Sequence, residues 1–228
     1  MNGFILYEGV TNGQRFVIIA TGIVRPSVNI KTGCMVQIWI LLVDHSPIEG
    51  VKLGIDAGTI CKGCPFSSGN GCYVNLGQAP LMIWNAYHRG SYPTLEDYSV
   101  FDARAIRFGA YGNPSLIPLK IVKAIRARAG KTTGYFHDWK TNWKAKPYNK
   151  YFMASTDTLE SLEEAKAEGL RVFHASRKKP TWGFKTCLNV THGIQCADCG
   201  LCNGSEGPDI WVPLHGSCAK KAFNLIQN

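Results

Sequence analysis

Residues 56–75 read DAGTICKGCPFSSGNGCYVN and place three cysteines within twelve positions. A short run at residues 51–55 predicts a strand that leads into this segment, and the glycines, serines and asparagines that follow indicate a loop. The loop has no apolar face into which Cys61, Cys64 and Cys72 could pack as small hydrophobic residues. Three thiols at the end of a strand therefore predict a metal or cluster site.

The chain before this loop is expected to be β-structure. Residues 4–7 and 16–20 are apolar runs typical of strands, and residues 11–14 (TNGQ) between them are a hairpin signal. Residues 35–43 are almost continuously apolar, which predicts a strand buried on both faces. Residues 1–45 are therefore predicted to form the N-terminal β elements of the fold.

After the loop, predicted helices and strands alternate. Helices are expected at residues 81–89, 115–129 and 159–168, and strands at 105–108, 132–137, 151–155, 170–175 and 209–214. Such alternation indicates βαβ units and a parallel sheet. The predicted fold is α/β, a TIM-like full or partial (β/α) barrel with an N-terminal β-hairpin and a Cys-rich C-terminal metal-binding segment. We expect one domain, with its β/α core at residues 51–180.

Polar residues follow several of these predicted strands. They are the turn 109–114 (GAYGNP), His137, Asp138, Ser155, Thr156, Asp157 and His174. Because the carboxyl ends of parallel strands meet at one rim, these residues are expected near the cysteine loop. The candidate groups facing a substrate are His137, Asp138 and Asp157. A capping box of Asp157 and Glu160 is expected to start the helix at 159–168.

The C-terminal segment, residues 185–228, carries four further thiols: Cys187, Cys196, Cys199 and Cys202. The C-x2-C-x2-C spacing predicts a bound metal or cluster, because neighbouring loop thiolates converge only on something cationic. The spacing leaves zinc and a second iron-sulfur cluster open, with His215 available to replace one thiol.

The composition predicts a soluble protein. No apolar run reaches the length of a membrane span, and the first residues lack the features of a signal peptide. The expected location is therefore the cytoplasm, where nine cysteines suit metal or cluster ligation better than a disulfide framework.

The formal net charge of +9 is unevenly distributed. Residues 120–150 hold nine lysines and arginines against one acid, with Trp139, Trp143 and other aromatic residues among them. This mixture suits a phosphate backbone and unstacked bases, and equally a solvated basic face with core aromatics behind it. The candidate nucleic-acid contacts are Lys120, Lys123, Arg126, Arg128, Lys131, Lys140, Lys144 and Lys146.

The order of these parts resembles the radical S-adenosylmethionine half-barrel. The shared parts are a strand, a three-cysteine loop ending in Cys72-Tyr73, a helix, and a strand closing on residues 109–114. In that family the loop cysteines hold a [4Fe-4S] cluster whose open iron binds S-adenosylmethionine, and a glycine-rich turn contacts the cofactor's amino group. The usual cysteine spacing there is three then two, whereas here it is two then seven.

The resemblance implies roles for individual residues. It implies cluster ligation by Cys61, Cys64 and Cys72, and cofactor contact near Gly109, Gly112, Asn113 and Ser155. The family's glutamate in the turn is absent, and Asn113 stands in that region.

Nearly the whole chain also resembles a family of cysteine-rich proteins encoded by bacteriophages. The stretches that carry the resemblance are SVNIKTG (27–33), CYVN (72–75), GAYGNP (109–114), TTGYFHDW (132–139), MASTDT (153–158) and HGS (215–217). It implies the cytoplasm of an infected bacterium as the setting, and no particular activity.

Three functional hypotheses follow. The first is an iron-sulfur, radical-SAM-like enzyme that acts on nucleic acid or nucleotides, with zinc or a second cluster in the C-terminal segment. The second is a zinc-stabilised nucleic-acid-binding protein without catalysis. The third is a base-modifying enzyme similar to tRNA-guanine transglycosylases, with Cys196, Cys199, Cys202 and His215 as zinc ligands.

Overall fold

The computed structural model describes residues 2–181, 183–204, 206–214 and 219–225. The strands are β1 (Gly3–Thr11), β2 (Gln14–Thr21), β3 (Val36–Leu42), β4 (Ala105–Tyr111), β5 (Lys131–Thr133), β6 (Tyr135–Phe136), β7 (Met153–Thr156), β8 (Val172–Ser176), β9 (Phe184–Thr186) and β10 (Asp209–Pro213). The α-helices are α1 (Pro47–Lys52), α2 (Ile55–Gly58), α3 (Ala79–His88), α4 (Leu119–Arg128), α5 (Leu159–Ala167), α6 (Leu188–His192), α7 (Cys196–Cys199) and α8 (Ala219–Leu225). Short 3-10 helices are η1 (Tyr98–Phe101), η2 (Pro114–Leu116) and η3 (Trp143–Tyr148).

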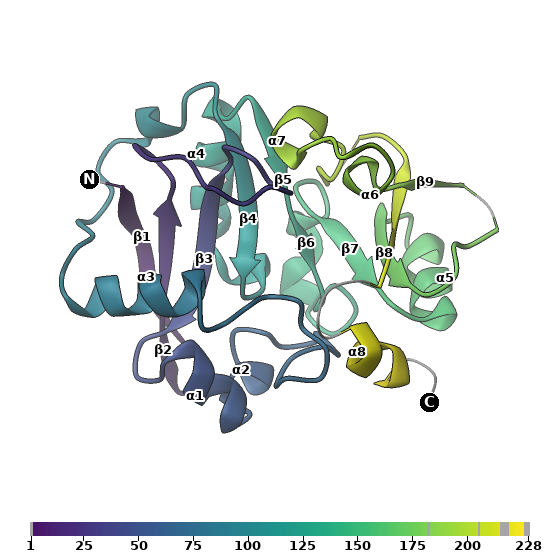
Figure 1. Cartoon of the computed structure of the whole chain (residues 1–228), viewed down its shortest axis with the longest axis horizontal. Coiled ribbons are helices and arrows are strands. Elements are labelled where there is room, and N and C mark those ends of the chain that lie inside the picture. Colours follow the sequence, from purple (N-terminus) through teal and green to yellow (C-terminus); the bar gives the residue numbers. More distant parts are fainter. Residues whose placement is uncertain (1, 182, 205, 215–218, 226–228) are drawn as a thin grey trace.

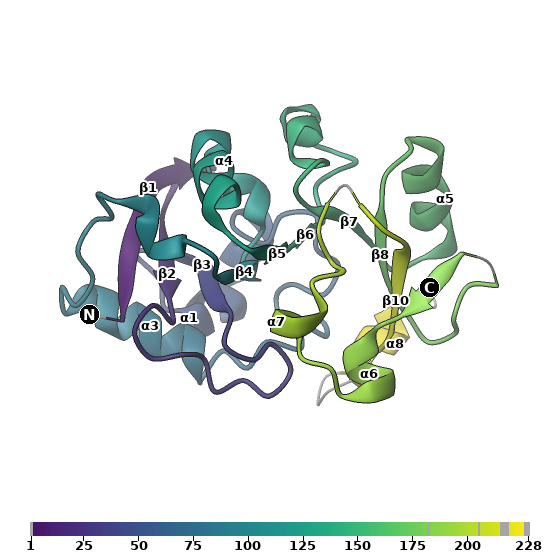
Figure 2. The same cartoon turned by 90° about the horizontal axis from the view of Figure 1, so that it is seen from above.

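The strands form two five-stranded sheets, ordered β1-β2-β3-β4-β5 and β6-β7-β8-β10-β9 (Figure 1). Figure 2 shows α4 and α5 on one side of the strands and α1, α3, α6 and α7 on the other. The hydrophobic core includes residues of both sheets, such as Ile40 and Phe136. The mixed α/β prediction is confirmed. No helix among the residues described could cross a membrane.

The predicted N-terminal hairpin is confirmed. β1 and β2 pair antiparallel and are joined by Asn12 and Gly13, which have positive φ angles of 47° and 76°. Two such residues in succession make the turn whose twist suits a hairpin. Asn12 Nδ2 also donates a hydrogen bond of 2.6 Å to the Gly58 carbonyl, which ties the turn to the segment before the cysteine loop.

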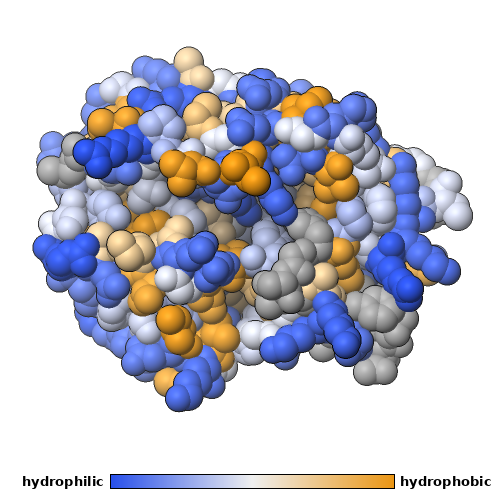
Figure 3. All heavy atoms as spheres, viewed as in Figure 1, coloured by the Kyte–Doolittle hydropathy of each residue, from blue (hydrophilic) through white to orange (hydrophobic). Residues whose placement is uncertain are grey.

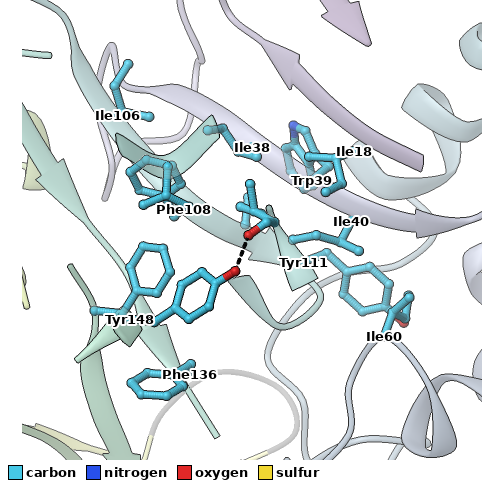
Figure 4. Packing of buried hydrophobic residues seen from close by; sticks show 14 of the residues in the cluster. Ile18, Ile38, Trp39, Ile40, Ile60, Ile106, Phe108, Tyr111, Phe136 and Tyr148 are labelled. Carbon is cyan, nitrogen blue, oxygen red and sulfur yellow. Dashed lines mark hydrogen bonds between the residues drawn. The ribbon is translucent and has the colours of Figure 1, made fainter. Parts of the chain in front are cut away.

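β3 is the central strand of the first sheet, and all seven of its residues are buried. It pairs antiparallel with β2 and parallel with β4. Figure 4 shows Ile38 and Ile40 from β3 packed near Phe108 from β4, with the hydrogen bond of 2.6 Å from the Tyr148 hydroxyl to the Ile117 carbonyl. The predicted strand buried on both faces is thus confirmed.

The predicted strand at residues 132–137 is divided between the two sheets. β5 pairs parallel with β4, β6 pairs parallel with β7, and only Gly134 separates them. A Cβ on Gly134 would lie 2.7 Å from the Phe152 ring, so a glycine is needed where that ring crosses the junction. The chain passes from one sheet to the other here, and every strand pair from β3 to β9 is parallel.

A closed TIM-like barrel is not confirmed. Among the strands that the structure describes, β1 and β9 end the two sheets without pairing with each other. The physical reason is the N-terminal hairpin of β1 and β2. Because β2 pairs antiparallel with β3, no further parallel strand can pair with that side of β3 and close a barrel.

The predicted strand at residues 51–55 is wrong, because helix α1 covers its first half and α2 begins at its end. Ser46 accepts a hydrogen bond from the Glu49 amide, and the Glu49 carboxylate accepts one from the Ser46 amide. With Pro47 in the first turn, this capping box favours a helix over a strand.

Two helix starts also differ from the prediction. α5 begins with a capping box of Thr158 and Ser161, rather than Asp157 and Glu160. α4 begins at Leu119 rather than near residue 115, because Pro118 forces the preceding residue out of helical geometry.

The face viewed in Figure 3 is mostly hydrophilic, and its hydrophobic side chains stand in small groups. One group lies in the region of α1 and α3, where Leu53 and Met82 are 61% and 63% exposed. Scattered groups of this size are ordinary on a protein surface and identify no interface by themselves.

Candidate metal centres

The first cysteine group lies in the loop between α2 and α3, which Figure 1 places near the carboxyl ends of the parallel strands. Backbone hydrogen bonds fold this loop into successive turns. The Cys61 amide donates to the Asp56 carbonyl at 2.8 Å, the Cys64 amide to the Cys61 carbonyl at 3.1 Å, and the Cys72 amide to the Phe66 carbonyl at 3.0 Å. All three thiols are half-buried and form no disulfide.

Electrostatic interactions show that the three thiols are neighbours. Burial raises the pKa of Cys61 well above its usual value, and Cys64 and Cys72 raise it further. Burial also raises the pKa of Cys64 to about 12, and Cys72 and Asp157 add to the increase. Without a cation the Cys61 and Cys64 thiols are therefore neutral, whereas a bound metal or cluster would stabilise their thiolates.

The side chains are not yet arranged as ligands. Among the described residues, no three His, Cys, Asp or Glu side chains have a geometry that could hold a metal ion. Sulfur ligands of one tetrahedral zinc ion would lie about 3.8 Å apart, given Zn–S bonds of about 2.3 Å. Ligation by Cys61, Cys64 and Cys72 therefore requires their side chains to reorient. The loop contains Gly63, Gly69 and Gly71, all at positive φ.

The turn after β4 is bonded to this loop. The Asn113 amide donates to the Ile60 carbonyl at 2.6 Å, and its side-chain Nδ2 donates to the Lys62 carbonyl at 3.4 Å. Gly112, at φ +82°, allows the chain to pass close to Ile40. Gly109 differs from the prediction, since it lies inside β4, where the pairing with β3 shifts register, and not in a turn after the strand.

His137 and Asp138 follow β6 and pack against the cysteine loop. A Cβ on Gly63 would be 3.2 Å from the Asp138 Cα and the His137 carbonyl. Asp138 is 5% exposed, and its Oδ2 accepts hydrogen bonds from Ser115 Oγ at 2.9 Å and Asn142 Nδ2 at 2.8 Å. Its Oδ1 has no hydrogen-bond partner among the described residues.

The residues at the end of β7 divide into two sets. Asp157 lies near Cys64 and is half-buried, and burial raises its pKa. Ser155 is half-buried, and its carbonyl accepts a hydrogen bond of 2.9 Å from Trp139 Nε1. Thr156 is instead fully buried beside His174, with 2.9 Å between Oγ1 and Nδ1. Thr156 and His174 therefore belong to the interior rather than to the rim.

His174 makes the stability of the fold depend on pH. Burial lowers its folded-state pKa to about 4, so below pH 6.5 the unfolded chain binds a proton that the folded protein excludes. We expect this group to remove about 3 kcal/mol of stability as the pH falls from 6.5 to 4. Urea unfolding of His174→Asn should show a shallower pH dependence than wild type. The exposed His192→Asn is the control, and an unchanged slope in His174→Asn would contradict the prediction.

His137 also lowers the stability of the fold as the pH falls. Burial lowers its pKa to about 4, partly offset by Asp138. At neutral pH the imidazole beside the cysteine loop is therefore uncharged and can accept or donate a single proton.

The second cysteine group lies near the opposite ends of the strands, where Figure 1 shows α6 and α7. Cys187, Cys196, Cys199 and Cys202 line one cavity. Burial raises the pKa of Cys196 and of Cys202, and the other thiols of the group add to both increases. The sequence thus predicted two thiol groups, and the structure brings the members of each together. His215, the proposed substitute ligand, lies outside the described residues.

Arg107 is a site residue that the sequence analysis missed. It projects from β4, is half-buried, and its Nη2 donates to the Tyr73 hydroxyl at 3.5 Å. Tyr135 and Cys196 also interact with it electrostatically. An arginine within the otherwise apolar stretch AIRFGAY was the available signal.

The eight candidate nucleic-acid contacts are all exposed. Three already have partners: Arg128 pairs with Asp102, Lys140 pairs with Glu164, and Lys131 donates to the Asp198 carbonyl. The aromatic residues among them differ in burial. Phe136, Trp139 and Tyr148 are buried, whereas Trp143 is 75% exposed with the Lys144 amine 5.6 Å from its ring centre. Part of the aromatic set therefore belongs to the core.

Comparison with protein-family models, curated proteins and solved structures finds no match to this chain. The radical-SAM and bacteriophage resemblances of the sequence stay predictions.

Proposed function

We propose that this chain is an iron-sulfur enzyme of the radical-SAM-like type that acts on nucleic acid or a nucleotide. The observation that supports this proposal is the convergence of Cys61, Cys64 and Cys72 in one half-buried loop at the carboxyl rim of parallel strands. Active sites of β/α folds lie at this rim, where the loops after the strands meet.

The strand order fits an open half-barrel. β3, β4 and β5 are parallel neighbours in the first sheet, β6, β7, β8 and β10 are parallel neighbours in the second, and Gly134 joins β5 to β6. The loop with three cysteines follows the first of these strands, and the turn with Gly112 and Asn113 follows the second. This is the order of parts that the radical-SAM resemblance implies.

The residues around the loop have distinct proposed tasks. A [4Fe-4S] cluster held by three thiolates would leave one iron open for S-adenosylmethionine and would supply the electron that cleaves it. Asn113 holds the loop through Ile60 and Lys62, and the adjoining turn at Gly112 would supply the backbone that contacts the cofactor. Asp157, half-buried beside Cys64, is the acidic group proposed to face the substrate, whereas Asp138 is buried and its Oδ1 has no hydrogen-bond partner in the described structure.

A metal and cofactor analysis tests the proposal. Protein purified and reconstituted without oxygen should hold iron and labile sulfide, show a brown visible spectrum, and convert S-adenosylmethionine to 5′-deoxyadenosine after reduction. Colourless protein that contains zinc and no iron after reconstitution would overturn the proposal. That outcome would favour the zinc-stabilised binding protein instead.

The proposed nucleic-acid partner is supported by Trp143, Lys144 and Lys146 on η3. The Trp143 side chain is 75% exposed, so a base can stack on its ring. The two exposed lysines beside it can pair with backbone phosphates. The exposed Lys120, Lys123 and Arg126 on α4 extend the cationic surface of the helical layer.

Trp143→Ala is expected to weaken binding of a single-stranded oligonucleotide by 5- to 150-fold, since stacking on one aromatic ring contributes about 1–3 kcal/mol. Fluorescence anisotropy at fixed salt measures the loss. Leu159→Ala, which truncates another side chain that is 66% exposed, is the control. If the Trp143 variant and the wild type bind with equal affinity, or if the wild-type affinity does not change with salt concentration, this surface is not the nucleic-acid-binding site.

A further inference from the structure

The four cysteines of the C-terminal segment line one small pocket. Cys187, Cys196, Cys199 and Cys202 all line it, and its volume is about 20 Å³. A cavity needs a volume of about 10–15 Å³ to hold one water molecule. The space between the thiols therefore has the size of one small ion. The four irons and four sulfides of a [4Fe-4S] cluster would need far more room.

The rest of the lining is largely apolar. Leu188, Ile194, Leu201 and Ile210 contribute to it, and no histidine or carboxylate of the described residues does. Four cysteine ligands would leave no coordination position of a tetrahedral ion for water or substrate, which is the arrangement of structural rather than catalytic zinc.

Three of the four cysteines are anchored by their backbones to other parts of the fold, whereas the Cys199 amide donates to the nearby Gln195 carbonyl. The Cys187 amide donates to the Trp211 carbonyl of β10 at 2.9 Å, and the Cys196 amide donates to the Lys31 carbonyl at 2.9 Å. The Cys202 carbonyl accepts from the Gly134 amide at 3.0 Å, at the junction of the two sheets. Because the backbones already converge, rotation of side chains is the rearrangement that ligation requires.

Arg107 supplies a compensating charge. Four thiolates around one divalent cation carry a net charge of −2, which is costly in a half-buried place without a counter-charge. Arg107 is half-buried and interacts with Cys196, and its other partners are the tyrosines Tyr73 and Tyr135 rather than a carboxylate. Lys131 lies on the same side and donates to the Asp198 carbonyl of α7.

We infer that Cys187, Cys196, Cys199 and Cys202 bind one tetrahedral zinc ion that joins residues 187–202 to β10 and to the junction of the two sheets. This site is structural and independent of the cluster proposed at Cys64. The choice of a single ion also excludes a second iron-sulfur cluster at this position.

The experiment uses the full chain with Cys64→Ser. This substitution removes metal binding at the first cysteine group, so the metal measured per chain reports on the second group. This variant should hold one zinc per chain and no labile sulfide. Adding Cys199→Ser should reduce zinc at least tenfold, whereas adding Cys34→Ser, at an exposed cysteine, should leave it unchanged. Zinc content that is insensitive to Cys199→Ser, or iron and sulfide retained in the Cys64→Ser chain, would overturn the inference.

A second measurement avoids dependence on the folding of the Cys199 variant. Cobalt added to metal-depleted Cys64→Ser protein should develop the intense near-ultraviolet thiolate absorption and visible bands of a tetrahedral sulfur site, saturate at one equivalent, and disappear when zinc is added. Saturation at another stoichiometry, or no such absorption, would contradict a single four-thiolate site. Either result leaves the iron analysis of the wild-type chain, which tests the proposed function, unaffected.

Discussion

Replacing Cys64 with serine is expected to remove the iron and labile sulfide of the anaerobically reconstituted protein, and with them the reductive cleavage of S-adenosylmethionine. Cys64 is half-buried and interacts with both Cys61 and Cys72, so its loss leaves two thiols in the loop. A serine hydroxyl does not ionise as a thiol does and is a poor ligand for a soft metal centre. We expect at least a tenfold loss of bound iron, measured by colorimetric iron and sulfide assays and by visible absorption.

Cys34→Ser is the matched control, because Cys34 is an exposed cysteine outside both thiol groups. It should retain the iron and the visible spectrum of the wild type. Circular dichroism of both variants would show whether either has lost its fold. Full iron and cofactor cleavage in the Cys64 variant would contradict the assignment of this loop, whereas loss of zinc alone would favour the non-catalytic alternative.

Replacing Gly112 with alanine is expected to destabilise the fold by about 2–5 kcal/mol. The new Cβ would lie 2.6 Å from the Ile40 Cβ and 2.8 Å from the Ile40 carbonyl oxygen, and Ile40 lies in the fully buried β3. Overpacking of this kind costs about 1–3 kcal/mol, and a φ of +82° adds about 1–2 kcal/mol for a residue with a side chain.

The variant Gly90→Ala separates the cost of the positive φ from the cost of overpacking. Gly90 has a φ of +68°, and a Cβ there would meet no atom within 4 Å, so we expect a loss of about 1 kcal/mol. Urea unfolding of both variants measures the difference. Equal losses would show that the turn after β4 can move away from Ile40. Because Asn113 is bonded to Ile60, such movement would also disturb the cysteine loop.

Several elements could be predicted because their signals are local. Asn12-Gly13 between two β-rich runs specifies a tight turn, and the continuous apolar run within residues 35–43 specifies a strand with no solvent-facing side. Gly90 and Gly169 end α3 and α5 as expected, both at positive φ. In each case the deciding interactions lie within a few residues.

Other features could not be predicted from local sequence, because residues far apart in the chain determine them. The division of residues 132–137 into β5 and β6 depends on the ring of Phe152, which lies just before β7 and packs against Gly134. The burial of Asp138 depends on Ser115 and Asn142, and the position of Arg107 near Cys196 depends on the path of the C-terminal segment.

The amino-acid sequence by itself determined that the chain alternates strands and helices and that its cysteines fall into two groups. Both properties follow from residue type and spacing along the chain. Tertiary structure alone decided that the strands form two open sheets, that the cysteine groups lie near opposite ends of the strands, and that the four C-terminal cysteines line one pocket. These properties arise from packing between residues far apart in sequence, where volume and backbone pairing, rather than local propensity, select the arrangement.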